Sequence, residues 1–72
     1  MYIEKVKKFT KREMEVLTLI GEGFSTKRIA QELFISINTV ETHRRHLLEK
    51  MEAKNSVELI RLVTRAMWLN AS

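Results

Sequence analysis

The stretch STKRIAQELFISINTVETHRRHLLEKM (residues 25–51) decides the fold, because it joins a short helical pattern to a long one across a very brief link. The short helix would follow Ser25, which is a favourable N-cap residue. Its apolar positions recur at helical spacing and are Ile29, Ala30 and Leu33. The link FISI (residues 34–37) contains a second candidate N-cap, Ser36. Two helices joined by so few residues must cross steeply, which predicts a helix-turn-helix arrangement.

The longer helix, from about Ile37 to Met51, has one apolar and one polar face. At 100° per residue, one face carries Val40, His43, Leu47 and Met51. The opposite face carries Asn38, Glu41, Thr42, Arg45 and Glu49. The chain therefore buries one side of this helix and presents a compact polar side, where a recognition helix would carry its base-reading residues.

A preceding helix is expected to begin at Thr10. Thr10 and Glu13 have the spacing of a capping box, in which each side chain satisfies an otherwise unpaired backbone amide. The apolar positions that follow are Val16, Leu17 and Ile20. Gly23 is the natural stop, because glycine tolerates the left-handed conformation that often ends a helix.

A last helix is expected to begin near Asn55 or Ser56, and Asn55 and Glu58 again have capping-box spacing. Its apolar positions are Leu59, Ile60, Leu62, Val63, Ala66, Met67 and Leu69. They cover about half of the helix circumference, which is more than packing on a three-helix core requires. The surplus is either a subunit interface or simply the closing helix of a very small core.

Length and composition agree with one small helical domain. The chain has 72 residues, no proline and only two glycines. The absence of cysteine excludes disulfides and thiolate metal sites. No apolar run approaches the roughly 20 residues that span a membrane. We expect an N-terminal arm or linker over residues 1–8, a domain over residues 9–70 and a cytoplasmic location.

The charge favours a polyanionic partner, and the side chains do not suggest catalysis. Thirteen Lys and Arg residues oppose nine Asp and Glu, a net charge of +4. No combination of nucleophile, base and orienting group occurs, and there is no glycine-rich phosphate loop. His43 and His46 are three apart, but no cysteine or acidic residue on their shared face completes a metal site. We expect neither an enzyme nor a bound metal or cofactor.

The order of these motifs resembles the LuxR/FixJ-type helix-turn-helix domain. The resemblance covers residues 9–59, and its anchors are TKREMEVL, Gly23, STKRIAQEL and ISINTVETHRRHLLEKM. It implies an all-α, four-helix domain that binds double-stranded DNA in bacterial transcription regulation. The third helix would enter the major groove and the fourth would form a homodimer contact. RNA polymerase is a further partner that the resemblance implies. The chain departs from the commonest pattern at Gly21, Glu41 and Ser56.

This resemblance and the chemistry of the side chains give a set of candidate site residues. The candidates for base contacts are Glu41, Thr42 and Arg45. The candidates for DNA-backbone contacts are Lys27, Asn38, Thr39, Arg44, Lys54 and Asn55. The candidates for the dimer interface are Ile60, Val63 and Met67.

Two other functions are compatible with the same helices. The promoter-reading region of a sigma factor has a related helix-turn-helix and would associate with polymerase. A helical protein-interaction module would act through the last helix and would show no salt-sensitive DNA binding. The polar face of the third helix argues against the interaction module, which has no need of that face.

Overall fold

The computed structural model describes the backbone of residues 8–71 and the side chains of residues 8–65. It contains helices α2 (Lys11–Gly21), α3 (Thr26–Leu33), α4 (Ile37–Met51) and α5 (Ser56–Ala71), and no strand occurs between residues 8 and 71. The expectation of an all-α fold with four helices is therefore confirmed. The proposed division into an arm (1–8) and a domain (9–70) stays a prediction, because residues 1–7 lie outside the described part.

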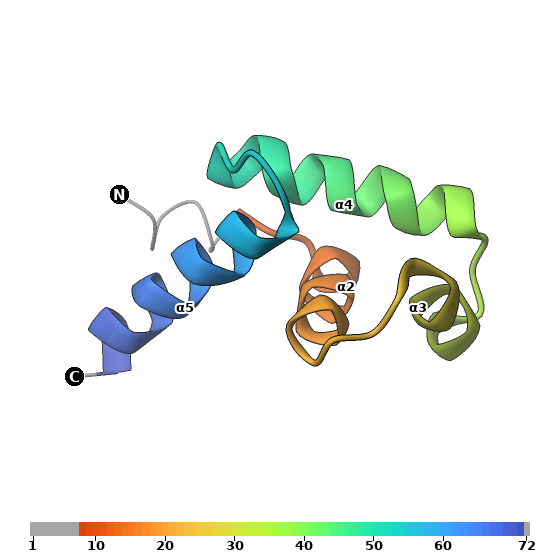
Figure 1. Cartoon of the computed structure of the whole chain (residues 1–72), viewed down its shortest axis with the longest axis horizontal. Helices are drawn as coiled ribbons and strands as arrows, with labels where there is room; N and C mark the ends of the chain where they lie inside the picture. Colours follow the sequence, from red (N-terminus) through yellow and green to blue (C-terminus); the bar gives the residue numbers. More distant parts are fainter. Residues whose placement is uncertain (1–7, 72) are drawn as a thin grey trace.

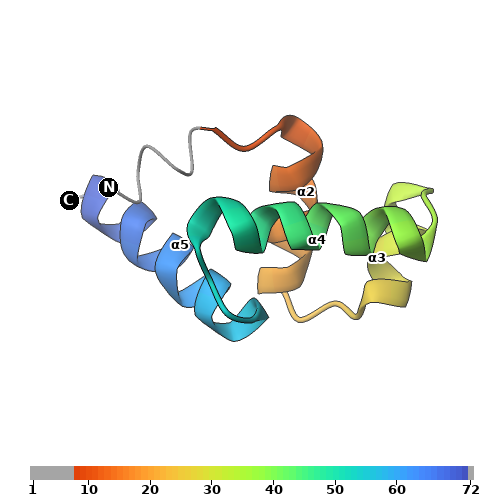
Figure 2. The same cartoon turned by 90° about the horizontal axis from the view of Figure 1, so that it is seen from above.

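Helix α4 runs along one side of the molecule and lies across α2 and α3 (Figures 1 and 2). Helix α3 packs near the N-terminal end of α4, whereas α5 lies towards its other end and contacts both α4 and α2. The core between them consists of Val16, Leu17, Ile29, Ala30, Val40, Leu47, Met51, Leu59 and Val63. Each helix contributes to this core, so the apolar faces predicted from helical spacing meet at one centre.

The helix starts follow the predicted caps. Thr10 and Glu13 form the complete capping box, with Glu13 N donating to Thr10 Oγ1 (3.1 Å) and Thr10 N to Glu13 Oε1 (2.9 Å). Ser25 and Ser36 cap α3 and α4 by accepting from the backbone N–H groups three residues later. At α5, Asn55 Oδ1 accepts from Glu58 N (2.9 Å). Glu58 accepts from the Lys54 amide rather than from that of Asn55, so only the Asn55 half of this box forms as expected.

Three helices end in the same left-handed turn, but only one of these turns uses glycine. After α2, Gly23 has φ +89° and the amides of Gly23 and Phe24 donate to carbonyls of the last turn, as the sequence predicts. After α3 and α4 the left-handed residues are Phe34 (φ 57°) and Glu52 (φ 54°). Non-glycine residues are uncommon there, because their Cβ crowds the backbone. The brief link between α3 and α4 therefore closes through a conformation that the residue Phe34 disfavours.

Candidate nucleic-acid interface

The outward side of α4 carries the residues predicted to read bases. Glu41 and Arg45 are exposed and Thr42 is half-buried, whereas Val40, Leu47 and Met51 on the other side are fully buried. Asn38 and Glu49 are exposed on the same outward face. Because the packed core fixes the rotation of α4, these polar side chains are presented together on one rigid helix.

The first turn of α3 is tied to this face by side-chain hydrogen bonds. The hydroxyl of Thr26 donates to Glu41 Oε1 (3.0 Å) and accepts from Nη2 of Arg44 (2.9 Å). Nε of Arg44 lies 3.9 Å from the same Glu41 oxygen and has no hydrogen-bond partner of its own. Arg44, a candidate for DNA-backbone contact, is thus largely enclosed, with 25% of its side chain exposed. Thr26 was not among the candidates, because only the three-dimensional crossing of α3 and α4 brings it to Glu41.

The hydroxyl groups at the start of α4 are turned towards the backbone or one another. Thr39 Oγ1 lies 2.8 Å from Ser36 Oγ, which also accepts from the amide of Thr39. Thr42 Oγ1 donates to the carbonyl of Asn38 (3.0 Å). The hydroxyl hydrogen of Thr42 is therefore used within the helix, which leaves the methyl group of Thr42 for a contact outside it.

The remaining backbone candidates lie at helix starts around α4. Lys27 is exposed in the first turn of α3, and Asn38 is exposed in the first turn of α4. Lys54 and Asn55 are exposed in the link before α5. Asn55 already uses its side-chain oxygen to cap α5. A helix N-terminus favours anions, and phosphate contacts at these positions stay a prediction.

The two histidines have separate surroundings. His46 Nδ1 lies 3.7 Å from Glu13 Oε2, a contact between α4 and α2. Nδ1 of His43 is buried and has no hydrogen-bond partner. Within residues 8–65, no three His, Cys, Asp or Glu side chains gather as a metal site would require. Glu13 was recognised from the sequence only as a capping residue.

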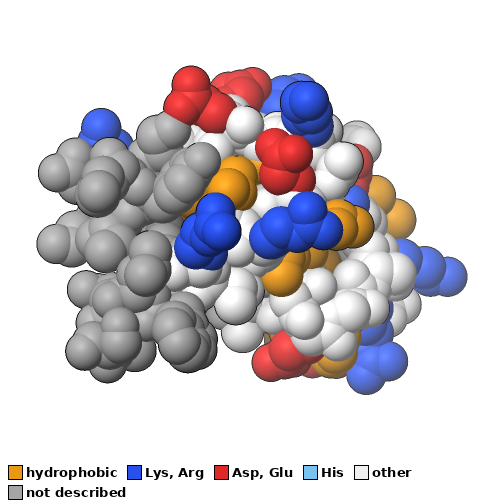
Figure 3. Space-filling model, turned by 60° about the vertical axis from the view of Figure 1, so that its left-hand side comes forward, with side chains coloured by type: hydrophobic (Ala, Val, Ile, Leu, Met, Phe, Trp, Pro, Cys, Tyr) orange, Lys and Arg blue, Asp and Glu red, His pale blue; other side chains and the backbone are white. Residues whose placement is uncertain are grey.

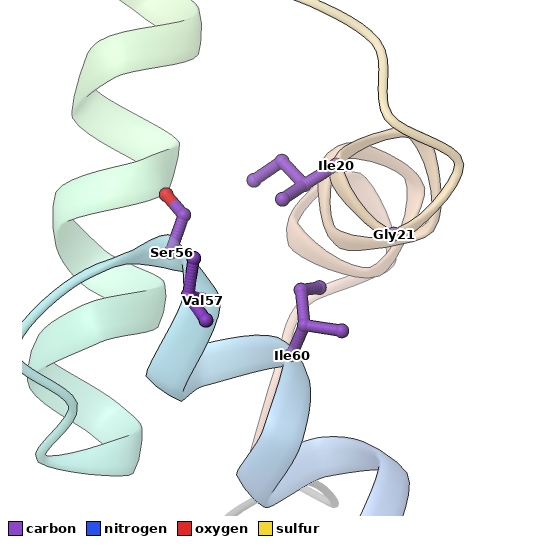
Figure 4. A pocket seen from close by; sticks show the side chains of 5 residues that line it. All are labelled: Ile20, Gly21, Ser56, Val57 and Ile60. Carbon is purple, nitrogen blue, oxygen red and sulfur yellow. The ribbon is translucent and has the colours of Figure 1, made fainter.

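The candidate dimer residues differ in accessibility. Val63 is 5% exposed and belongs to the core, so it offers little surface to a second subunit. Ile60 is half-buried and lines a shallow apolar groove between α2 and the start of α5, with Ile20, Gly21, Ser56 and Val57 (Figure 4). Val57 is 69% exposed. The Met67 side chain lies outside the described residues.

Charges on the face shown in Figure 3 are mixed rather than of one sign. Lys and Arg side chains there alternate with acidic ones, and hydrophobic atoms are visible between them. The net positive charge of the chain is therefore not gathered into a single basic patch on this face.

Comparison with known proteins identifies the family. Residues 7–63 match the family model of bacterial regulatory proteins of the luxR family, and the chain belongs to this family. Over 51 residues it is 45% identical to the oxygen regulatory proteins NreC of Staphylococcus carnosus (strain TM300) and Staphylococcus haemolyticus (strain JCSC1435). These alignments cover 71% of this chain and 24% of each relative, so the chain spans about a quarter of their length.

A solved structure supports the same assignment. Full-length FixJ from B. japonicum matches with a TM-score of 0.79 and 37% sequence identity, over 90% of this chain and 32% of that chain. The resemblance inferred from the sequence motifs is thus confirmed. The chain is a DNA-binding helix-turn-helix domain of the type that serves transcription regulation, and the family that it matches is one of regulatory proteins. Within the described residues, no helix is both long and apolar enough to span a lipid bilayer.

Proposed function

We propose that this domain binds duplex DNA with α4 in the major groove, as the output module of a bacterial regulator. The observation that carries the proposal is the division of α4 into a fully buried apolar face and an exposed polar face centred on Glu41 and Arg45. The N-terminal part of a recognition helix contacts base edges in this architecture. Glu41, Thr42 and Arg45 read bases in this proposal.

Contacts to phosphates would fix the position of α4 in the groove. The proposed set is Lys27, Asn38, Thr39, Arg44, Lys54 and Asn55. Of the cations, Lys27 and Lys54 are free to approach a phosphate directly, whereas Arg44 would use a guanidinium nitrogen other than Nη2, which stays bonded to Thr26. Since each cationic contact releases counterions, binding should weaken steeply as salt is raised.

A homodimer through α5 would place two copies of α4 about one helical turn of DNA apart, roughly 34 Å. Ile60 and Met67 remain the proposed contact residues, and the exposed Val57 lines the same groove as Ile60. Val63 supports the interface from within the core rather than by direct contact. Pairing two weakly binding domains would raise the affinity for a repeated site.

The family match favours a transcription regulator over a sigma factor. A regulator of this type acts in the cytoplasm, where it meets the chromosome, and RNA polymerase is the partner proposed for activation.

Fluorescence anisotropy of a labelled, randomised duplex pool at two salt concentrations tests DNA binding. Arg45→Ala should weaken binding to selected duplexes by about 1–3 kcal/mol if Arg45 pairs with guanine. Arg61→Ala removes the same charge from the exposed surface of α5 and is the matched control. If the folded wild type bound no duplex at low salt, the proposal would be wrong and a protein-interaction role through α5 would replace it.

A further inference from the structure

We propose that Thr26 is a positioning residue for base selection, because its hydroxyl fixes the Glu41 carboxylate as an acceptor for the amino group of a cytosine. The proposal rests on the proposed function, in which Glu41 faces the major groove. It adds a residue of α3 to a recognition surface otherwise formed by α4.

Only one oxygen of the Glu41 carboxylate takes part in a hydrogen bond within residues 8–65 of the protein. Its Oε1 accepts from the Thr26 hydroxyl at 3.0 Å and lies 3.9 Å from Arg44 Nε, and the described part of the chain provides no further hydrogen bond or ion pair to this carboxylate. The Glu41 side chain remains 53% exposed. Thr26 itself is held by the Arg44 guanidinium at 2.9 Å, so its hydroxyl hydrogen is directed at Glu41 rather than free to rotate. The outward part of the carboxylate is thereby presented in one orientation.

Arg44 also reduces the electrostatic repulsion between the Glu41 carboxylate and the DNA phosphates. An acidic side chain in the groove is repelled by the phosphates, and this repulsion is reduced when a cation stands next to it. Arg44 Nε lies 3.9 Å from Glu41 Oε1, and the guanidinium is only 25% exposed. Because less solvent surrounds it there, its attraction for the carboxylate is screened less than at the open surface.

Cytosine is the base that best fits such an acceptor. In the major groove its N4 amino group is a donor without a neighbouring acceptor on the same base, whereas the amino group of adenine lies next to the acceptor N7. Within the base pair, the adenine amino group has an acceptor on both sides, N7 and O4 of the paired thymine, whereas the cytosine amino group has one on one side only, O6 of the paired guanine. A carboxylate therefore meets less repulsion at cytosine than at adenine. Guanine and thymine offer only acceptors, apart from the thymine methyl group.

A positioning role of Thr26 and a purely structural role of Thr26 predict changes in different measured properties. A structural tie between α3 and α4 would affect the stability and the affinity for all sequences alike. A positioning role affects the preference at one base position. Thr26→Val keeps the shape and removes the hydroxyl, and Ser25 still caps α3. Thr26→Ser restores the hydroxyl. Thr64→Val makes the same replacement at an exposed position of α5.

The experiment is selection from a randomised duplex pool followed by sequencing, for the wild type, these three variants and Glu41→Ala, with folding checked by circular dichroism. Glu41→Ala identifies the base position at which a cytosine preference is lost. Thr26→Val should reduce that preference about five-fold, the effect of one hydrogen bond of ordinary net strength, with the salt dependence unchanged. Thr26→Ser and Thr64→Val should retain the preference.

An unchanged preference in Thr26→Val, or an equal loss for all sequences, would overturn the inference and leave DNA binding intact. Failure of the folded wild type to bind any duplex would overturn both the inference and the proposed function. A selected adenine in place of cytosine would refute the assignment of the base.

Discussion

Nζ of Lys50 in α4 lies 2.6 Å from Oε1 of Glu13 in α2, and the Glu13 side chain is 4% exposed. The same carboxylate completes the capping box of α2, and Lys50 also donates to the carbonyl of Lys8 (3.1 Å). One acidic residue thus joins the start of α2 to the helix that carries the proposed recognition surface. This ion pair ties α2 to α4 near the C-terminal end of α4, whereas Thr26 contacts α4 nearer its N-terminal end, at Glu41 and Arg44.

The Glu13–Lys50 pair should make stability depend on pH. Burial raises the pKa of Glu13, but the hydrogen bonds from Lys50 and Thr10 outweigh it and lower the pKa below its ordinary value. The contribution is present above the ordinary pKa and is lost as the pH falls through the lowered pKa. Denaturation midpoints between pH 7 and pH 3 should decrease in the wild type, and the decrease should be smaller in Glu13→Gln.

Glu13→Gln should also destabilise the domain at pH 7 by about 1–2 kcal/mol, less than for a fully buried pair because Lys50 is partly exposed. The matched control is Glu49→Gln, which removes the same charge from an exposed site on α4. Urea denaturation measures the free energy of unfolding of both variants. Equal stabilities of the two variants would contradict the role assigned to Glu13.

Replacing each of the two glycines by alanine should change the stability of the domain in opposite directions. Gly21 lies in the last turn of α2, and an added Cβ would meet Ile60 Cδ1 at 3.7 Å, an ordinary contact. Gly21→Ala should therefore stabilise the domain by up to about 1 kcal/mol. Gly23 has φ +89° and open space around it, so Gly23→Ala should cost roughly 1–2 kcal/mol through backbone strain alone. Thermal denaturation of both variants gives the signs directly.

Phe34 should be replaceable with a gain in stability. It is 94% exposed and left-handed, so it buries little and its backbone is strained. Asparagine tolerates this conformation better, and Phe34→Asn should stabilise the domain by about 0.5–1 kcal/mol. Phe24→Asn is the comparison, because Phe24 packs against the core and its replacement should destabilise. A loss of stability in Phe34→Asn would show that the Phe34 side chain makes a contact needed for folding.

Thr42 should select thymine through its methyl group, because its hydroxyl donates to Asn38. Thr42→Val should keep the base preference at that position, whereas Thr42→Ser should lose most of it. Binding measured on duplexes that differ only at the selected base distinguishes the two variants. Retention of the preference by Thr42→Ser alone would indicate that the hydroxyl, and not the methyl group, reads the base.

The sequence predicted what depends on local spacing. Thr10, Ser25 and Ser36 cap their helices as expected, since a cap requires only residues three positions apart. The tertiary contacts of Glu13 with Lys50 and of Thr26 with Glu41 join different helices, and no local pattern specifies them. The burial of Val63 likewise depends on how α5 packs against α2 and α4. The apolar positions of α5 cover more of the helix than the core can bury, so the sequence does not show which of them face the core.

The most direct test of the central claim is to follow backbone amide NMR shifts of the ¹⁵N-labelled domain while a selected duplex is added. If α4 enters the major groove, the largest changes should fall between Asn38 and Glu49 and at Lys27. Changes confined to the start of α5, around Val57 and Ile60, would contradict DNA recognition by α4.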